Sequence, residues 1–451
     1  MKLARPSRII AAAALLLGAA LPSAACAQAA ADAVTAFVDV TVIPMDTERA
    51  LPGQTVLVQG DRIIAVGPSA SVAVPGGARR IDGRGKYLTP GLAEMHGHVP
   101  QPANNPQYTE DVLFLYLASG ITTVRGMLGA EGQLDLRRRI IRGELAGPML
   151  YLAGPSFNGN SVASPEAAAA MVRAQKAGGW DLLKVHPGLT RAEYDAMART
   201  AAEEGIRFGG HVPEEIGLMH ALRMGQETFD HVDGYVEYAG GADGPVDPAK
   251  LDSAVRMTRE AGAWVVPTMA LWEVLFTTLD LDSLRAYPEL RYASPRQVNA
   301  WVNSFNQRRN APQFDMATSR RVIAARQQVL AALHRGGAGI LMGTDAPQEF
   351  SVPGFSLHRE FPRMTAAGMT PFDILATGTR NVGAYFQRND AFGTVAVGRR
   401  ADLLLLNADP LADIANLQRI AGVMARGRWM SSDEIKTRLE AIAARHAAAP
   451  Q

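Results

Sequence analysis

The feature that most constrains the fold of this chain is an alternation between short apolar runs and alanine-rich segments. It extends from Tyr87 to about Gln387. Apolar runs that end in polar residues predict strands, and the intervening segments, such as SPEAAAAMVRAQKAGG and TRAEYDAMARTAAEEG, predict helices. Strands that alternate with helices form a parallel sheet, either a barrel or a doubly wound sheet. About eight such units fit, which favours an α/β fold of the (β/α)8 TIM-barrel type over residues 87–387.

The two ends of the chain have a different pattern. FVDVTVIPM, QTVLVQG and RIIAVG near the start, and GTVAVG, RADLLLLN and GVMARGRWM near the end, read as short strands separated by turns. We therefore predict that residues 28–86 and 388–430 form one small β-sandwich domain, and that residues 431–451 form a C-terminal helix or tail. Residues 275–335 interrupt the alternation with a long helical stretch, which is either a peripheral decoration or, as we favour, a lid over the C-terminal mouth of the barrel.

Residues 1–27 resemble a secretory signal peptide. Three basic residues lie among the first eight, an apolar run covers residues 9–21, and Ala-Cys-Ala at 25–27 reads as a cleavage site. The apolar run is too short for a transmembrane anchor, and a lipoprotein would need Cys26 as its lipidated residue. Cleavage after Ala27 would leave no cysteine, so a metal ion would need His, Asp, Glu or a modified Lys. We expect export, in a bacterial cell to the periplasm.

The overall charge limits the class of partner. The formal net charge of +1 argues against nucleic-acid binding and against a polybasic membrane-surface protein. We expect a small-molecule substrate and no stable membrane insertion. Association into a homo-oligomer is left open by the sequence.

Potential metal ligands follow the apolar runs of the barrel region. His96 and His98 come after the first run, in LTPGLAEMHGH, and residues i and i+2 of a strand point to the same face. The same test at later runs adds four more side chains: Lys184, His211, His231 and Asp345. Because barrel active sites lie at the C-terminal ends of strands, we predict that all six converge on a metal centre.

The types of side chain indicate a centre with two metal ions. Neutral imidazoles suit zinc and similar divalent ions, and two ions about 3.5–4 Å apart need an anionic bridge. Lys184 supplies that bridge if carbon dioxide carboxylates its amine. A hydroxide between the ions would then be the nucleophile, and Asp345 would take its proton and pass it to the leaving amine.

These motifs resemble the metal-dependent amidohydrolase superfamily, particularly the branch of imidazolonepropionase-like proteins and carboxylated-lysine prolidases. GHVP, FDHVDGY and GTDAP match its fifth-, sixth- and eighth-strand motifs, and GFSLHREF and FGTVAVGRRADLLLLNADPLADI resemble its closing segments. The resemblance covers nearly all of the mature chain. It implies one buried metal ion on His96, His98 and Asp345, and a more exposed one on His211 and His231, with Lys184 bridging both.

Four further residues have two readings each. His358 either orients the substrate or a group that supports the metal ligands, or it is a helix-capping or buried structural histidine. Tyr235 either reaches a substrate carboxylate or carbonyl or packs a loop. Arg125 is either a carboxylate anchor or a buried ion-pair partner. His186, two residues after Lys184, supports the ligands or is structural.

The sequence therefore predicts an exported binuclear hydrolase, with zinc as the expected metal. It would cleave amide bonds in small substrates such as Xaa-Pro dipeptides or N-acyl amino acids. A lactone, cyclic amide or phosphotriester hydrolase could use the same centre, and an exported metal- or ligand-binding protein is the alternative without catalysis.

Overall fold

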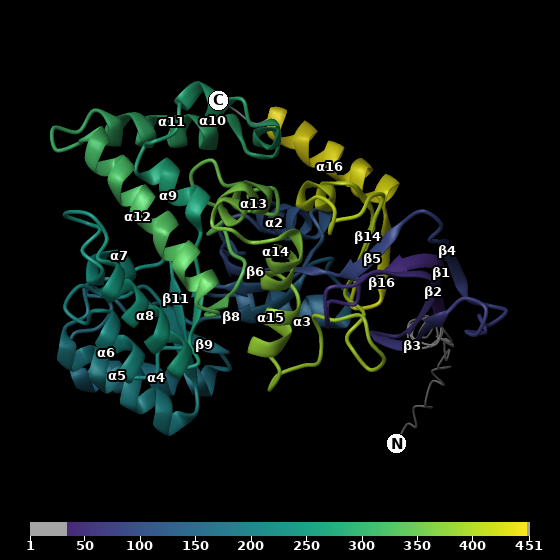
Figure 1. Ribbon diagram of the computed structural model, residues 1–451, viewed down its shortest axis with the longest axis horizontal. Coiled ribbons are helices and arrows are strands. Elements are labelled where there is room, and N and C mark those ends of the chain that lie inside the picture. Colours follow the sequence, from purple (N-terminus) through teal and green to yellow (C-terminus); the bar gives the residue numbers. More distant parts are fainter. Residues whose placement is uncertain (1–33, 449–451) are drawn as a thin grey trace, which may run out of the picture.

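The computed structural model describes residues 34–448, so the predicted signal peptide lies outside the described residues. Two sheets of parallel strands occupy the middle of the molecule (Figure 1). The first has the order β6-β7-β8, with bounds Leu92–Gly97, Ile121–Gly126 and Met149–Leu152. The second has the order β13-β12-β11-β10-β9. Its strands are β9 Leu182–Val185, β10 Arg207–Gly210, β11 Thr228–Asp230, β12 Trp264–Val266 and β13 Gly339–Ile340.

Backbone hydrogen bonds link these two sheets at both of their outer edges. Phe157 N, just after β8, donates to Lys184 O of β9 over 2.8 Å. At the other edge, Asp345 N, after β13, donates to His96 O of β6 over 2.7 Å. The carboxyl ends of strands from both sheets therefore meet.

A third sheet combines strands from both ends of the chain, at the right of Figure 1. It has the order β16-β15-β14-β5-β1-β2-β3, with β4 paired to β1. Its strands are β1 Val34–Val42, β2 Leu51–Gln59, β3 Arg62–Pro68, β4 Arg79–Asp82, β5 Tyr87–Pro90, β14 Leu403–Leu406, β15 Ile420–Ala425 and β16 Arg428–Ser431.

This third sheet is strongly curled. Trp429 of β16 packs edge-on against Phe37 of β1, with ring centroids 5.3 Å apart, although three strands separate β16 from β1 in the sheet order. In a flat sheet they would be about 19 Å apart. We expected a β-sandwich, whereas the described strands form one continuous hydrogen-bonded sheet because β5 pairs with both β1 and β14.

The helices that follow the parallel strands include several that begin or end at capping residues. Ser164 caps α4 through its Oγ, which accepts from Ala167 N, and the helix ends at Gly179 in the left-handed region. Thr190 and Glu193 form a capping box at the start of α5. The helices of this half are α2 Pro106–Ala118, α3 Gln133–Arg142, α4 Pro165–Gly178, α5 Arg191–Glu204, α6 Leu218–Arg223, α7 Tyr235–Tyr238 and α8 Pro248–Glu260.

The expected helical insertion at 275–335 is helical but broken into pieces. After α9 (Met269–Leu275) it contains α10 Leu281–Arg285, η1 Pro288–Tyr292, α11 Pro295–Arg309 and α12 Met316–Arg335. The chain then continues through α13 Leu357–Ala366, α14 Pro371–Thr377, α15 Arg380–Tyr385, η2 Ile414–Gln418 and α16 Ser432–Ala447. Within residues 34–448, none of the helices is both long and apolar enough to cross a lipid bilayer.

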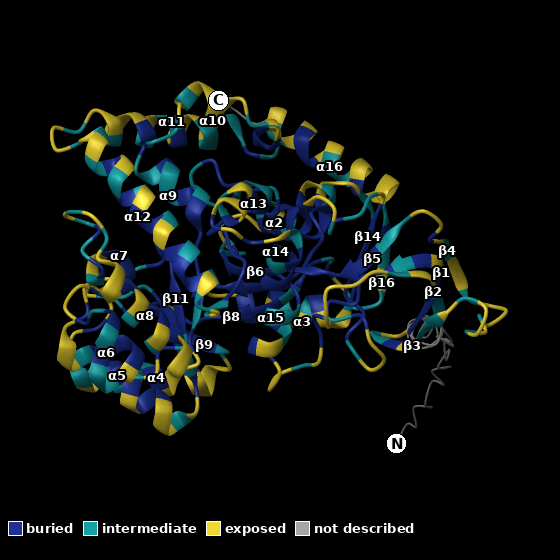
Figure 2. Ribbon diagram, viewed as in Figure 1, coloured by how far each residue is buried: buried dark blue, intermediate teal, exposed yellow. Residues whose placement is uncertain are grey.

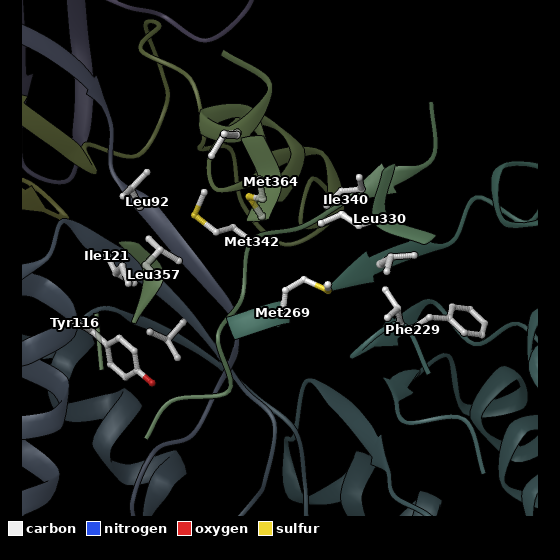
Figure 3. Close-up of a cluster of buried hydrophobic side chains, with 14 of the residues drawn as sticks. Leu92, Tyr116, Ile121, Phe229, Met269, Leu330, Ile340, Met342, Leu357 and Met364 are labelled. Carbon is white, nitrogen blue, oxygen red and sulfur yellow. The ribbon is translucent and has the colours of Figure 1, made fainter. Parts of the chain in front are cut away.

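The main core lies between the parallel strands and the helices that cover them. Figure 2 shows the strands buried and the outer faces of the helices exposed. In Figure 3, Leu330 of α12 and Met364 of α13 lie near Ile340 and Met342. Burying a side chain of this size stabilises the fold by about 1.5–3 kcal/mol. Helix α12 is therefore held firmly against the end of β13.

Candidate metal centre

Asp345 is the common neighbour of three histidines. Its Oδ1 lies 2.6 Å from Nε2 of His98 and 3.6 Å from Nε2 of His96. Its Oδ2 lies 3.7 Å from Nε2 of His231. One ligand atom from each of His96, His231 and Asp345 falls within 4.8 Å of the others, so these three buried side chains could hold one metal ion.

The remaining predicted ligands extend this cluster. Nζ of Lys184, fully buried, lies 3.1 Å from Nε2 of His96. The His211 ring lies 4.5 Å from the His231 ring, and His186 stacks on His211 at 4.9 Å. The structure thus brings all six predicted ligands together, and His186 lies beside them.

Glycines in the motifs allow the strand ends to approach. A Cβ on Gly343, two residues before Asp345, would lie 2.4 Å from a Val266 methyl and 2.9 Å from His96 N. A Cβ on Gly210, which has φ +122°, would lie 2.6 Å from Val185 O. Because such contacts are forbidden, only glycine lets the His and Asp motifs reach one centre.

Three residues around the centre have left-handed backbone conformations that are unusual for side-chain-bearing residues. They are His231 with φ +66°, Asp345 with φ +65° and Thr268 with φ +45°. Such conformations cost about 1–3 kcal/mol each and persist where the surrounding structure enforces them, commonly at functional sites. They turn the side chains off the strand ends and into the cluster.

In His231 and His211, the ring nitrogen that points away from the cluster lies close to a protein oxygen. Nδ1 of His231 is 2.7 Å from Thr268 Oγ1, and Nδ1 of His211 is 2.7 Å from Asp233 Oδ2. When Nδ1–H donates to these oxygens, the lone pair of Nε2 is left for a metal ion. Nε2 of His231 is buried and has no hydrogen-bond partner within the described residues, as expected of a metal ligand.

His96 has a buried carboxylate behind it. Its Nδ1 lies 2.7 Å from Oδ2 of Asp230, although the angle is not that of a hydrogen bond. Asp230 is in turn paired with Arg125, whose Nη2 lies 3.1 Å from both carboxylate oxygens. All three side chains are almost completely buried. The Arg125–Asp230 pair therefore supports the ring of His96.

Electrostatics favours the protonation states that bind metals. Burial lowers the pKa of His96 and of His231 well below the ordinary value, so both rings are neutral. Burial also lowers the pKa of Lys184 to about 8. Burial alone would raise the pKa of Asp345, but the hydrogen bond with His98 and the positive charge of Lys184 hold it below the usual range. Neutral imidazoles and an ionised carboxylate are a donor set that fits a divalent cation.

The three residues proposed for substrate contact lie elsewhere or have other partners. Tyr235 is fully buried, and its hydroxyl is 2.6 Å from Thr258 Oγ1, which corresponds to the packing alternative. Arg125 is the buried ion-pair partner described above, rather than a carboxylate anchor. His358 is on α13, where its ring packs edge-on against Phe361 at 5.3 Å and its Nδ1 has no hydrogen-bond partner within residues 34–448.

Glu94 is a site residue that the sequence analysis missed. Its Oε1 accepts hydrogen bonds from His96 N and Thr344 N, both over 2.9 Å, and its Oε2 accepts from Thr344 Oγ1 over 2.6 Å. Burial raises its pKa to about 8 despite these bonds. Glu94 joins the ends of β6 and β13. Its position two residues before His96, on the same strand face, was a signal that could have found it.

The chain is similar in sequence and in fold to several known proteins. The sequence matches the amidohydrolase family over residues 87–430. It is 25% identical over 411 residues to the adenine deaminase of Rubrobacter xylanophilus, covering 88% of this chain but only 58% of that relative's length. A solved structure of bottromycin amidohydrolase is similar with a TM-score of 0.73 and 25% identity, covering 96% of this chain and 95% of that one. A Xaa-Pro dipeptidase with bound methionine has a TM-score of 0.68 at 20% identity, covering 88% and 100%.

The parallel strands and the family match define an amidohydrolase-type fold, and the cluster at the strand ends contains three side chains that could hold a metal ion. The chain belongs to the amidohydrolase family.

Proposed function

We propose that this protein is an exported binuclear hydrolase that cleaves amide bonds of small substrates, such as Xaa-Pro dipeptides or N-acyl amino acids. The observation that carries the proposal is the convergence of four histidines, one lysine and one aspartate on a single buried cluster. As a purely structural core the cluster would carry a cost of about 1–3 kcal/mol, because the buried Nε2 of His231 has no hydrogen-bond partner within the described residues.

In this proposal the six side chains hold two divalent ions, with zinc as the expected metal. His96, His98 and Asp345 would hold the more buried ion, and His211 and His231 the other. Lys184, carboxylated on Nζ, would bridge them, and its burial beside His96 supports that role. When bound, the ions would polarise a carbonyl and activate water for attack at neutral pH.

Asp345 is the proposed general acid and base. Its Oδ1 is within 2.6 Å of His98 Nε2 and accepts a hydrogen bond from Gln348 Nε2 over 3.0 Å. These contacts hold the carboxylate in one orientation at the cluster. From there it can accept a proton from the attacking water and deliver it to the leaving nitrogen.

The wider assignments belong to the same proposal. The hydrogen bonds at both edges of the two parallel sheets support a closed (β/α)8 barrel over residues 87–387. We further propose that residues 28–86 and 388–430 form the accompanying β-domain, which β5 (Tyr87–Pro90) joins although the predicted boundary lay at residue 86. Residues 275–335 would be a lid, and 431–451 a terminal helix or tail. Residues 1–27 would direct export to the periplasm and be removed.

The names of similar proteins favour amide substrates. One similar structure is a Xaa-Pro dipeptidase and another an amidohydrolase of bottromycin. The likeness to an adenine deaminase supports hydrolytic deamination of a purine base as a second candidate. Both reactions break a carbon–nitrogen bond at the same type of centre.

The test is hydrolysis of a substrate panel by the zinc-reconstituted protein, with Asp345→Asn as the blank. The panel contains Xaa-Pro and other dipeptides, N-acyl amino acids, adenine, and a matched lactone. Turnover of dipeptides or N-acyl amino acids that vanishes in the blank supports the proposal. Turnover of adenine alone favours the deaminase, and turnover of the lactone alone shows that the bond has been assigned wrongly.

A further inference from the structure

An arginine from the inserted helical segment reaches the backs of two proposed metal ligands. Arg326 lies on α12 and is only 3% exposed. One of its Nη2 hydrogens is donated to the backbone oxygen of His231. The same Nη2 lies 3.7 Å from Oδ1 of Asp233.

Asp233 connects this arginine to a second histidine. Its Oδ2 lies 2.7 Å from Nδ1 of His211, so its two carboxylate oxygens face different partners. The side chain of Asp233 is 17% exposed, and a carboxylate that has lost most of its contact with water is costly without a nearby cation. Arg326 therefore stabilises the charge of Asp233, and Asp233 in turn holds the ring of His211.

Trp272 also contacts the guanidinium group of Arg326. Cζ of Arg326 lies 4.0 Å from the centroid of the Trp272 ring, a cation–π contact. The Trp272 ring is itself 5.7 Å from the ring of His231. The planar guanidinium can stack on the indole and serve two oxygen acceptors at once, a combination that a lysine ammonium cannot reproduce.

We propose that Arg326 is a positioning residue for the metal ion held by His211 and His231, so that α12 is part of the metal centre and does more than cover it. The inference rests on the proposed metal role of those two histidines. It predicts that removing the guanidinium selectively weakens the binding of this ion, because Arg326 contacts the His231 backbone and Asp233, whereas the ring of His96 lies against the separate Arg125–Asp230 pair.

The test is zinc titration of the metal-free protein in competition with a chromophoric chelator. We expect two ions in the wild-type protein and, in Arg326→Met, a roughly 10- to 100-fold weaker affinity for one ion with the other unchanged. Arg326→Lys keeps the positive charge but loses the planar guanidinium group. Its affinity for the same ion should fall by a smaller factor. Arg320→Met, which removes an exposed arginine of the same helix, should bind both ions as the wild type does.

The outcomes separate this inference from the proposed function. If the Arg326→Met variant binds both ions with wild-type affinity, the inference is overturned. If thermal unfolding shows that this variant does not fold, Arg326→Lys decides in the same way. The inference would also be overturned if Arg326→Met lowered the affinity for both ions equally. The same holds if Arg320→Met lost as much affinity as Arg326→Met. A wild-type protein that binds fewer than two ions refutes the binuclear proposal, and this inference with it.

Discussion

The hydrogen bond between His231 and Thr268 makes a sharp prediction about metal affinity. The two side chains are fully buried, with Nδ1 and Oγ1 2.7 Å apart. Replacing Thr268 with valine removes the acceptor and keeps a β-branched side chain of nearly the same shape. The backbone of Thr268 has φ +45°. Because valine is β-branched like threonine, the substitution leaves the branching of the side chain at this position unchanged.

The cost can be worked out from the tautomers of the ring. In Thr268→Val, a proton kept on Nδ1 of His231 would be a buried donor without an acceptor, at a cost of about 1–3 kcal/mol. A proton moved to Nε2 would occupy the lone pair that a metal ion needs. Zinc binding at this histidine must overcome that cost, so the affinity of one ion should fall roughly 5- to 150-fold.

The assay is the same competition titration with zinc, and Thr277→Val is a matched control. Thr277 is also a buried threonine with positive φ, +49°, and its hydroxyl has no partner within the described residues. Its removal should leave both affinities unchanged. If Thr268→Val binds zinc as tightly as the control, the orientation of the His231 ring does not depend on this hydrogen bond, and the reasoning is refuted.

Three further predictions concern stability, substrate contact and the bridge. Arg400→Met leaves the buried carboxylate of Asp402 without the guanidinium that lies 2.7 Å away. Urea unfolding should show that the free energy of unfolding falls by about 3–5 kcal/mol, and a fall of less than about 1 kcal/mol would contradict this prediction. Tyr235→Phe should lower the unfolding free energy by about 0.5–1.5 kcal/mol and leave KM unchanged. A raised KM would instead indicate that the Tyr235 hydroxyl contacts the substrate. Lys184→Met should reduce bound zinc from two ions to one by elemental analysis; two retained ions would refute the bridge.

The cluster could be anticipated because its residues follow a local rule. A polar side chain directly after a buried run lies at the carboxyl end of a strand, and parallel strands bring those ends together. That rule selects all six predicted ligands: His96, His98, Lys184, His211, His231 and Asp345. The rhythm of strands and helices is likewise a local pattern, since it depends on side-chain periodicity within each segment.

The supporting contacts could not be anticipated, because they depend on three-dimensional proximity. Thr268 reaches His231 only because its own backbone adopts a left-handed conformation two residues after β12. Arg326 comes from a helix far along the chain. Tyr235, four residues after His231, seemed within reach of a substrate, yet the chain buries its hydroxyl against Thr258 of α8.

The third sheet has a consequence for the order in which the protein can be assembled. Strand β5 pairs with β1 on one side and with β14 on the other, where Leu403 lies opposite Pro90. A chain made from its N-terminus presents β5 long before β14 exists. Until then one edge of β5 offers unpaired backbone groups, which can pair with another molecule. We therefore expect a growing or prematurely ended chain that stops before Leu403 to aggregate more readily than the full-length protein.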